Sequence, residues 1–400
     1  MPPKREKSQS KTQVTIRKTD RHLPSSRIRY KLAHPFFDER EEAALRSVLN
    51  SGRLIQGPWV EKLESHVRSI TTSRHAVAVS SGTAALHVAY QAVDLKPGEA
   101  VFVSSFAWPS AANVARMMGA VPILIDARPG SYNIDPDHLI RRIETCRKEG
   151  WGKPRLIVPV HQFGLPCEIG EIELIAERFR LEIIEDAACA LGAAFEDRSV
   201  GTCGKMGIFS FHPRKSVTTG EGGMIVTDDE GLAGRCRALR NHGQQAAFDF
   251  IGPGLNYRMS ELHAALGAVQ MDKLESILET RKMLAEVYLN ELREVDGIIL
   301  PEAPDNHTWQ TFMVCVPQES REEIIGGLAE RHGVEAGIGS VDAHSLPMYR
   351  TLPGWEPLPV AARLQAEGMA LPLHAGLARK DIIACAGALA EVMERVKVLQ

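Results

Sequence analysis

The sequence predicts an α/β fold, with a mainly parallel sheet in a large domain and a smaller α+β domain at the C-terminal end. Short, continuously apolar segments alternate with helical patterns between residues 75 and 229, as in a parallel sheet covered by helices on both faces. A long helical pattern over 260–295 separates this region from a mixture of short strands and helices. For 400 residues we expect two domains, over 31–275 and 276–400.

The expected elements follow one another in a regular order. Helices are predicted over 36–52, where Gly52 ends the pattern, and over 59–71. The C-terminal part has a predicted strand at 307–316 and a helix at 319–333. The alternating region between them has predicted helices at 82–93, 110–119 and 168–180, and predicted strands at 75–81, 100–105, 121–127, 154–160, 181–187, 206–212 and 224–229.

Charge is distributed unevenly along the chain. The net charge is −3, but residues 1–30 hold nine Lys/Arg against two Asp/Glu, so this segment carries +7 and the other 370 residues carry −10. The segment is polar, and it predicts a disordered, solvated tail in preference to one that binds an anionic partner. It has no apolar core of the kind that signal peptides contain.

Composition argues against several classes of protein. The small net charge gives no indication of a nucleic-acid or membrane partner, and no stretch of the sequence is apolar enough to cross a membrane. The seven cysteines are scattered and form no CxxC pair. This pattern favours free thiols in a reducing cytoplasm and argues against a metal site.

Two ionisable residues each follow a predicted buried strand. Asp186 ends EIIED, and Lys215 follows FSFHPR, where His212 and Arg214 add positive charge. A lysine in such a setting is a nucleophile that forms a Schiff base with an aldehyde, and a buried carboxylate needs a cationic partner. Pyridoxal phosphate (PLP) has both an aldehyde and a protonated pyridine nitrogen. A solvated lysine and a helix N-cap explain either residue alone, so the prediction depends on the pair.

Three other segments have the residue types of a ligand site. Gly82 and Thr83 open a predicted helix, where backbone N–H groups bind phosphate, although plain N-capping is the favoured explanation of this segment alone. Trp108 follows a strand at the sheet edge where α/β proteins bind ligands, and it fits either ring stacking or core packing. Asn256 precedes a helix and fits either an anion site or a cap. The spacing alone does not decide between these alternatives.

The order of five motifs resembles the DegT/DnrJ/EryC1/StrS aminotransferase family. The resemblance covers about residue 31 to the end and leaves the basic tail outside. It implies a PLP-dependent enzyme of fold type I (aspartate aminotransferase-like) that works as a homodimer with shared active sites. Most members aminate keto-sugars carried on nucleotides. The motifs are SSGTAAL, FAWPSAAN, EDAACALGA, SFHPRKSVTTGEGGMIVTDD and NYRMSELHAALGAVQ.

By position, the resemblance assigns the contacts to the cofactor. Lys215 would be the lysine that holds PLP and moves the proton, and Asp186 would hold the ring nitrogen. Trp108 would stack on the ring, and Asn256 would reach the phosphate in the neighbouring subunit. The remaining phosphate contacts would come from Gly82, Thr83 and Ser210.

The same resemblance suggests substrate contacts and contains one departure. His161 and Gln162 in PVHQFGLP are placed by it near the cofactor and substrate. Candidate acceptor contacts lie in the poorly patterned segments 55–57, 307–310 and 344–349, of which His344 is taken as a substrate contact. Cys189 stands where relatives often have glutamine or histidine near the phenolic oxygen of the cofactor. A thiol is a weak hydrogen-bond partner, so Cys189 weakens this one polar contact and leaves the other cofactor contacts unchanged.

These assignments predict a ping-pong transamination from an amino acid, with L-glutamate as the first choice, to a keto-sugar. A dehydratase of the same family is a weaker alternative, because such relatives have histidine in place of the lysine at 215. A PLP-binding regulator is also weaker, since Lys215 and Asp186 are both present. The sequence does not distinguish a nucleotide-linked sugar from an acceptor of the cyclitol or aminohydroxybenzoate type.

Overall fold

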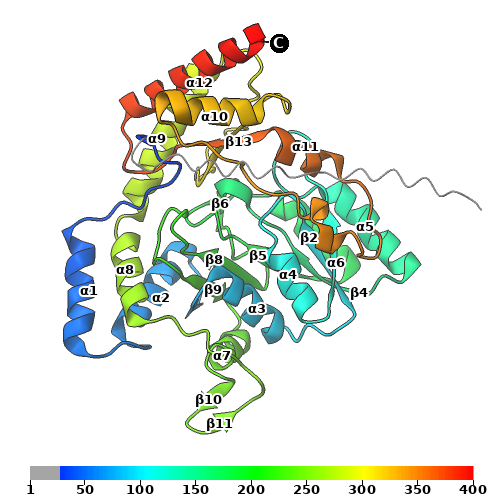
Figure 1. Ribbon diagram of the computed structural model, residues 1–400. Helices are drawn as coiled ribbons and strands as arrows, with labels where there is room; N and C mark the ends of the chain where they lie inside the picture. Colours follow the sequence, from blue (N-terminus) through cyan, green and yellow to red (C-terminus); the bar gives the residue numbers. More distant parts are fainter. Residues whose placement is uncertain (1–27, 400) are drawn as a thin grey trace, which may run out of the picture.

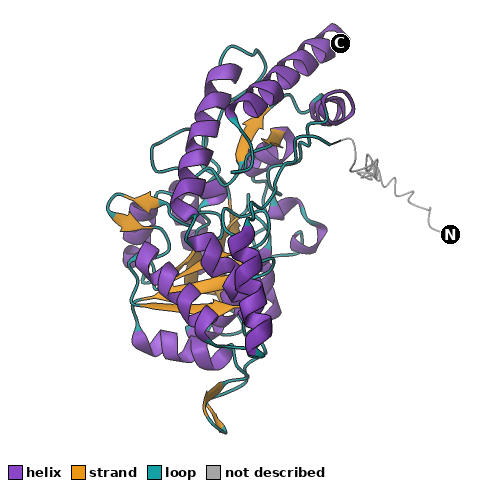
Figure 2. Ribbon diagram, turned by 90° about the vertical axis from the view of Figure 1, so that its left-hand side faces the viewer, coloured by secondary structure: helices purple, strands orange, loops and turns teal. Residues whose placement is uncertain are grey.

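The protein has two packed units, seen in a computed structural model that describes residues 28–399. The predicted tail up to residue 27 lies outside the described residues. A large unit surrounds a seven-stranded sheet, and a smaller helical unit stands above it in Figure 1. Figure 2, turned by 90°, shows helices on both sides of the sheet. The predicted α/β class is confirmed, and so is the mainly parallel sheet.

The central sheet has the strand order β1-β9-β8-β5-β4-β2-β3. Five neighbouring strands, from β8 to β3, are parallel, while β9 is antiparallel to both β8 and β1. The chain turns back from β8 directly into β9 through residues 211–222, and such a return joins antiparallel strands. The bounds are β1 (His75–Val79), β2 (Glu99–Ser104), β3 (Val121–Ile125), β4 (Lys153–Val158), β5 (Glu182–Asp186), β8 (Met206–Ser210) and β9 (Gly223–Thr227).

Both faces of this sheet are buried, because alternate side chains of each strand point to opposite sides. Val101 and Val103 of β2 join the core beneath α3 (Gly82–Ala92), α4 (Ser110–Met117) and α7 (Glu230–Leu239). Ala100 and Phe102 join the opposite core, with α5 (Pro136–Glu149) and α6 (Ile169–Phe179). Continuously apolar strands therefore reflect a sheet covered on both faces.

The first two helices pack against α8 (Glu261–Met271). α1 (Glu39–Ser51) ends at Gly52, as predicted, where φ is 67°. At the start of α2 (Pro58–Thr71), the buried Glu261 carboxylate accepts N–H bonds from Gly57, Trp59 and Val60 at 2.8–3.0 Å. A carboxylate at a helix N-terminus satisfies free N–H groups and complements the helix dipole, so α8 fixes the position of α2.

The helical pattern over 260–295 forms two helices, α8 and α9 (Leu274–Leu292), so the expected nearly uninterrupted helix is wrong at Asp272–Lys273. The break carries no glycine or proline. Lys273 is buried there, and its Nζ lies 2.5 Å from Glu41 Oε1 and 2.9 Å from Asp38 Oδ2. These contacts come from the far end of the chain, which explains why the local pattern does not show them.

The smaller unit packs three helices on a two-stranded antiparallel sheet. Tyr30 is buried in this core, and its N–H donates to the Gly333 carbonyl at 3.0 Å, so the chain is already packed at the end of the predicted tail. The elements are α9, α10 (Arg321–His332), α12 (Arg379–Leu399), β12 (Phe312–Cys315) and β13 (Gly368–Leu371). The short strand β12 lies within the predicted segment 307–316, and α10 lies within 319–333.

Arg281 joins segments within the smaller unit, while other segments of the C-terminal part reach the large unit. Arg281 of α9 is fully buried, and its Nη1 donates to the carbonyls of Trp309, Gln310 and Leu373 at 2.9–3.1 Å. Burial lowers the pKa of its guanidinium to about 10. Two short 3₁₀ turns, η3 (Ala343–Ser345) and η4 (Pro347–Tyr349), and α11 (Pro359–Glu367) pack on the core of the large unit. The C-terminal part of the chain therefore reaches back to the sheet.

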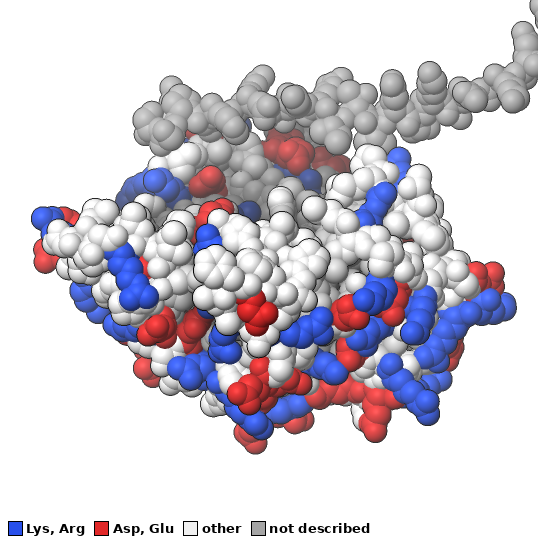
Figure 3. Space-filling model, turned by 90° about the horizontal axis from the view of Figure 1, so that it is seen from below, with Lys and Arg blue, Asp and Glu red and all other residues white. Residues whose placement is uncertain are grey.

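The surface has mixed charge and one projecting hairpin. On the face seen in Figure 3, cationic and anionic side chains are interspersed around an uncharged central area. The hairpin of β10 (Gln244–Ala246) and β11 (Asp249–Phe250) extends from the lower end in Figure 1 and carries exposed Phe248 and Phe250. A smaller hairpin joins β6 (Ala194–Phe195) and β7 (Arg198–Ser199). None of the helices in the described part is both long and apolar enough to span a membrane.

Candidate active site

A cavity of about 450 Å³ opens at the edge of the sheet where the carboxyl ends of the strands meet. Segments after β1, β2, β4, β5 and β8 line it, as is usual for ligand sites of open α/β sheets. The smaller unit closes the opposite side with Gln310, Thr311 and Ser340. Of the predicted residues, the structure brings together Gly82, Thr83, Trp108, Gln162, Asp186, Cys189, Ser210 and Lys215.

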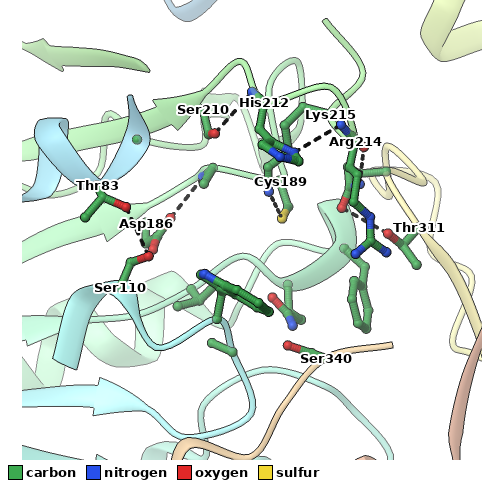
Figure 4. Close-up of a pocket in the computed structure, with 18 of the residues that line it drawn as sticks. Thr83, Ser110, Asp186, Cys189, Ser210, His212, Arg214, Lys215, Thr311 and Ser340 are labelled. Atoms are coloured by element: carbon green, nitrogen blue, oxygen red, sulfur yellow. Dashed lines mark hydrogen bonds between the residues drawn. The ribbon is translucent and has the colours of Figure 1, made fainter. Parts of the chain in front are cut away.

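Lys215 lies on the loop between the antiparallel strands β8 and β9. Its backbone N–H donates to the His212 carbonyl at 2.8 Å, which closes a turn directly after the strand. Its Nζ donates to Cys189 Sγ at 2.9 Å, and Figure 4 shows these two side chains meeting in the cavity. The amine is therefore held inside the cavity by a weak acceptor, which a ligand easily replaces.

Asp186 is the last residue of β5, and its side chain is 7% exposed. The carboxylate accepts a hydrogen bond from the Ala188 N–H at 3.1 Å. Burial raises the pKa of Asp186, and the Ala188 N–H together with the positive charge of Lys215 acts against that rise. A buried carboxylate with a single backbone donor has bonding capacity left for a cationic ligand group.

Hydroxyl groups gather at the start of α3. Ser81 caps the helix by accepting the Ala84 N–H at 3.1 Å, and the first N–H groups of the helix have no partner within it. Thr83 Oγ1 and Ser110 Oγ lie 3.2 Å apart, and Ser210 lies beside them at the end of β8. A Cβ at Gly82 would come within 3.0 Å of Ser210 Cβ, so the close approach of these segments favours glycine.

These features fit PLP in three places. The start of α3, with its hydroxyls and positive helix end, suits a phosphate. Asp186 suits a protonated ring nitrogen, and the Lys215 amine suits an aldehyde. In Figure 4, Thr83 and Ser110 lie at one end of the cavity, and Asp186 lies between them and Cys189. Trp108 borders the same cavity and is 70% exposed, which leaves its ring face accessible.

Three predicted residues lie outside the cavity lining. His161 is 0% exposed, with its Nε2 3.0 Å from Glu185 Oε2 and its Nδ1 accepting the Cys167 N–H. His344 stacks on Trp355, with ring centroids 4.7 Å apart, and its Nδ1 is 3.4 Å from Asp342 Oδ2. Asn256 is exposed and bridges to Asn241. The two histidines are therefore engaged in internal packing, while Asn256 lies outside the lining of this cavity.

Sequence reasoning missed much of the remaining lining. Ser110 follows Trp108 by two residues and is the first residue of α4. A serine at the start of a predicted helix could have been recognised as a candidate site residue. Arg214 was considered only as charge beside Lys215, yet it lines the cavity itself. Thr311 and Ser340 come from irregular segments of the smaller unit, where no local pattern indicates a site. Only the tertiary fold identifies these last two.

Glu185, next to Asp186, fixes the backbone of residues 201–204 beneath the site. Its carboxylate is fully buried and accepts bonds from the N–H groups of Gly201, Cys203 and Gly204 at 2.7–2.8 Å, besides its contact with His161. Burial acts to raise the pKa of Glu185, but the bonds from His161 and the backbone outweigh it and leave the pKa below its usual value. The carboxylate therefore stabilises the fold above the pKa of an unfolded glutamate, about 4.3, and this contribution is lost as the pH falls through the lower folded-state value.

We expect Glu185→Gln to reduce the free energy of unfolding by about 3 kcal/mol, because an amide NH₂ would face backbone N–H donors. Chemical denaturation near pH 7 measures the change. Glu177→Gln, on the exposed side of α6, is the matched control and should change stability by less than about 0.5 kcal/mol. Equal stabilities of the two variants would contradict this role for Glu185.

Comparisons with known proteins agree with this geometry. A model of the DegT/DnrJ/EryC1/StrS aminotransferase family matches residues 35–390. A DegT DnrJ EryC1 StrS aminotransferase from Brucella abortus is 31% identical, with 88% of this chain and 94% of that chain covered at a TM-score of 0.83. DesV of S. venezuelae, solved in complex with a ketimine intermediate, is 31% identical over 90% and 99% of the two chains, at 0.83. NtdA of Bacillus subtilis, with bound cofactor PMP, is 28% identical over 93% and 84%, at 0.81.

Proposed function

Because this chain belongs to the DegT/DnrJ/EryC1/StrS aminotransferase family, we propose that it is a PLP-dependent enzyme that transfers an amino group from an amino acid to a keto-sugar. L-Glutamate is the proposed donor, and a nucleotide-linked keto-sugar is the proposed acceptor. PLP, when bound, supplies an aldehyde that reacts with amines and a ring that takes up negative charge. The remaining chemistry belongs to residues of this chain.

The observation that carries the proposal is the position of Lys215 and Asp186 in one cavity, where Cys189 accepts a bond from the Lys215 amine. The Lys215 amine takes the proton from the α-carbon of the donor and delivers one to the acceptor carbon in the second half of the reaction. The Asp186 carboxylate keeps the ring nitrogen protonated. Thr83, Ser110 and Ser210 bind the phosphate.

A homodimer is part of the proposal. Asn256 is exposed, and it lies outside the cavity lining of its own subunit, so a second copy is needed for it to reach a phosphate. Exposed apolar side chains at Trp108, Phe248 and Phe250 supply surface that a partner subunit would cover. On this view each active site combines residues of two copies.

The direct test is a substrate panel with the purified protein and PLP. L-Glutamate and L-glutamine serve as donors, and keto-sugar nucleotides and cyclitol ketones serve as acceptors. We expect 2-oxoglutarate from glutamate together with an aminated sugar nucleotide, both measured by mass spectrometry. Borohydride should bleach the visible absorption of the bound cofactor and leave the cofactor mass on the peptide that contains Lys215.

Three results of this substrate panel would contradict the proposed function, each in a different way. Loss of water from the sugar without formation of a keto acid would replace the proposal with a dehydratase. Amination of cyclitol ketones alone would overturn the proposed acceptor. Binding of PLP without turnover of any donor would favour a regulator.

A further inference from the structure

A positive charge without an acidic partner faces the cavity. The Arg214 side chain lines it, and among residues 28–399 no carboxylate lies within 4.0 Å of the guanidinium. Glu221 also lines the cavity but forms no ion pair with Arg214. Arg214 is exposed, and the planar fork of donors in an arginine matches the two oxygens of a carboxylate or phosphate. The cavity therefore offers one free site for an anion on this wall.

This cation is distant from the place that suits the cofactor phosphate. Figure 4 shows the Arg214 guanidinium beside Thr311, at the end of the cavity opposite Thr83 and Ser110. The hydroxyls and helix start that suit a phosphate are all at the Thr83 end. Arg214 is thus available to an anionic group of a substrate.

Two buried polar side chains of the same cavity also lack a partner. Gln162 is 4% exposed and Ser340 is 8% exposed. Neither the side-chain amide of Gln162 nor the hydroxyl of Ser340 forms a hydrogen bond with another residue of the described part. Buried polar side chains are usually hydrogen-bonded, so such groups in a cavity wall indicate contacts that a ligand completes. Together with Arg214, they give one cation and two neutral groups able to donate to an oxygen.

The backbone of Arg214 is fixed relative to the catalytic lysine. Gln310 Nε2 donates to the Arg214 carbonyl at 2.6 Å. The backbone carbonyl of Gln310 in turn accepts a hydrogen bond from Arg281 Nη1. Lys215 is the next residue, and its turn is closed by His212. The backbone positions from which the Arg214 and Lys215 side chains extend are therefore fixed relative to each other, which favours a site for a group on the reacting carbon.

We propose that Arg214, with Gln162 and Ser340, binds the α-carboxylate of the amino donor. This inference rests on the proposed transamination. The donor carries its α-carboxylate on the same carbon as the amino group, whereas the diphosphate of a sugar nucleotide is several bonds from the ketone. A cation adjacent in the chain to Lys215 fits the first arrangement. The subsite also selects α-amino acids over simple amines.

The test measures the donor half-reaction alone, by the change in cofactor absorption in single turnovers. The donors are L-glutamate, L-glutamine and 4-aminobutyrate, which is glutamate without its α-carboxylate. Arg214→Gln should lower the ratio of rate constant to dissociation constant roughly 10- to 100-fold for both glutamate and glutamine, and leave it unchanged for 4-aminobutyrate. Arg178→Gln, an exposed arginine at the end of α6, is the matched control and should change none of the three.

The other outcomes each overturn the inference. Losses for glutamate and 4-aminobutyrate but not glutamine would assign Arg214 to the side-chain carboxylate. Unchanged donor kinetics in Arg214→Gln would remove any role in donor binding. If the wild type reacts with no donor, the proposed function fails instead, and a normal melting temperature of Arg214→Gln separates a binding defect from misfolding.

Discussion

Lys215→Ala is expected to lower the rate of both half-reactions by at least roughly 10⁴-fold, because in the proposed mechanism one amine both anchors the cofactor and moves the proton. The cavity would keep its phosphate end and Asp186, so the variant should still bind PLP non-covalently. Single-turnover rates with glutamate and with the keto-sugar measure the loss. Borohydride should then leave no cofactor mass on the peptide from 209 to 229.

Two further measurements distinguish chemistry from damage to the fold. Lys148→Ala, an exposed lysine paired only with Glu149, should react like the wild type. Small alkylamines added to Lys215→Ala should restore part of the rate, since they supply the missing base. Retention of the wild-type rate by Lys215→Ala without added amine would be incompatible with the assigned role.

The sheet could be predicted because its signal is local. Each central strand is buried on both sides, so continuous apolar runs such as VFVS and LIV show directly in the sequence. The break at Lys273 was not readable, since the carboxylates of Asp38 and Glu41 that surround this lysine lie more than 200 residues away in the chain. The strands of the hairpin at 244–250 are very short, and the phenylalanines there are exposed. The sequence therefore shows no alternation of apolar and polar residues that would predict this hairpin.

The same distinction separates the site residues. Those after strand ends, such as Asp186 and Lys215, were predictable because parallel strands share one carboxyl edge. His161 also follows a strand, but both of its ring nitrogens have partners within the protein, the Cys167 N–H and the buried Glu185 carboxylate. Neither contact can be predicted from the local sequence. Ser340 and Thr311 reach the cavity only because the smaller unit folds back over the sheet.

Asp186→Asn is expected to reduce both half-reactions by roughly 100-fold to several thousand-fold, the equivalent of about 3–5 kcal/mol for a broken buried ion pair. Asparagine has the same shape and keeps the Ala188 N–H bond, but it has no charge to hold a proton on the ring nitrogen. Burial raises the pKa of Asp186, and a cationic ring would favour the ionised form of the carboxyl. Weaker PLP binding should accompany the loss of rate.

The measurements for Asp186→Asn are the single-turnover rates, the PLP dissociation constant and the pH dependence of the cofactor absorption. The spectral transition of the ring nitrogen should move to lower pH, because the protonated form loses its anionic partner. Asp137→Asn, in the exposed first turn of α5, is the control and should leave all three unchanged. Asp186→Glu should retain more activity than Asp186→Asn, since it keeps the charge in a longer side chain. If the amide supports the same rate and spectrum as the carboxylate, the ring nitrogen has another partner, and the assignment of Asp186 is wrong.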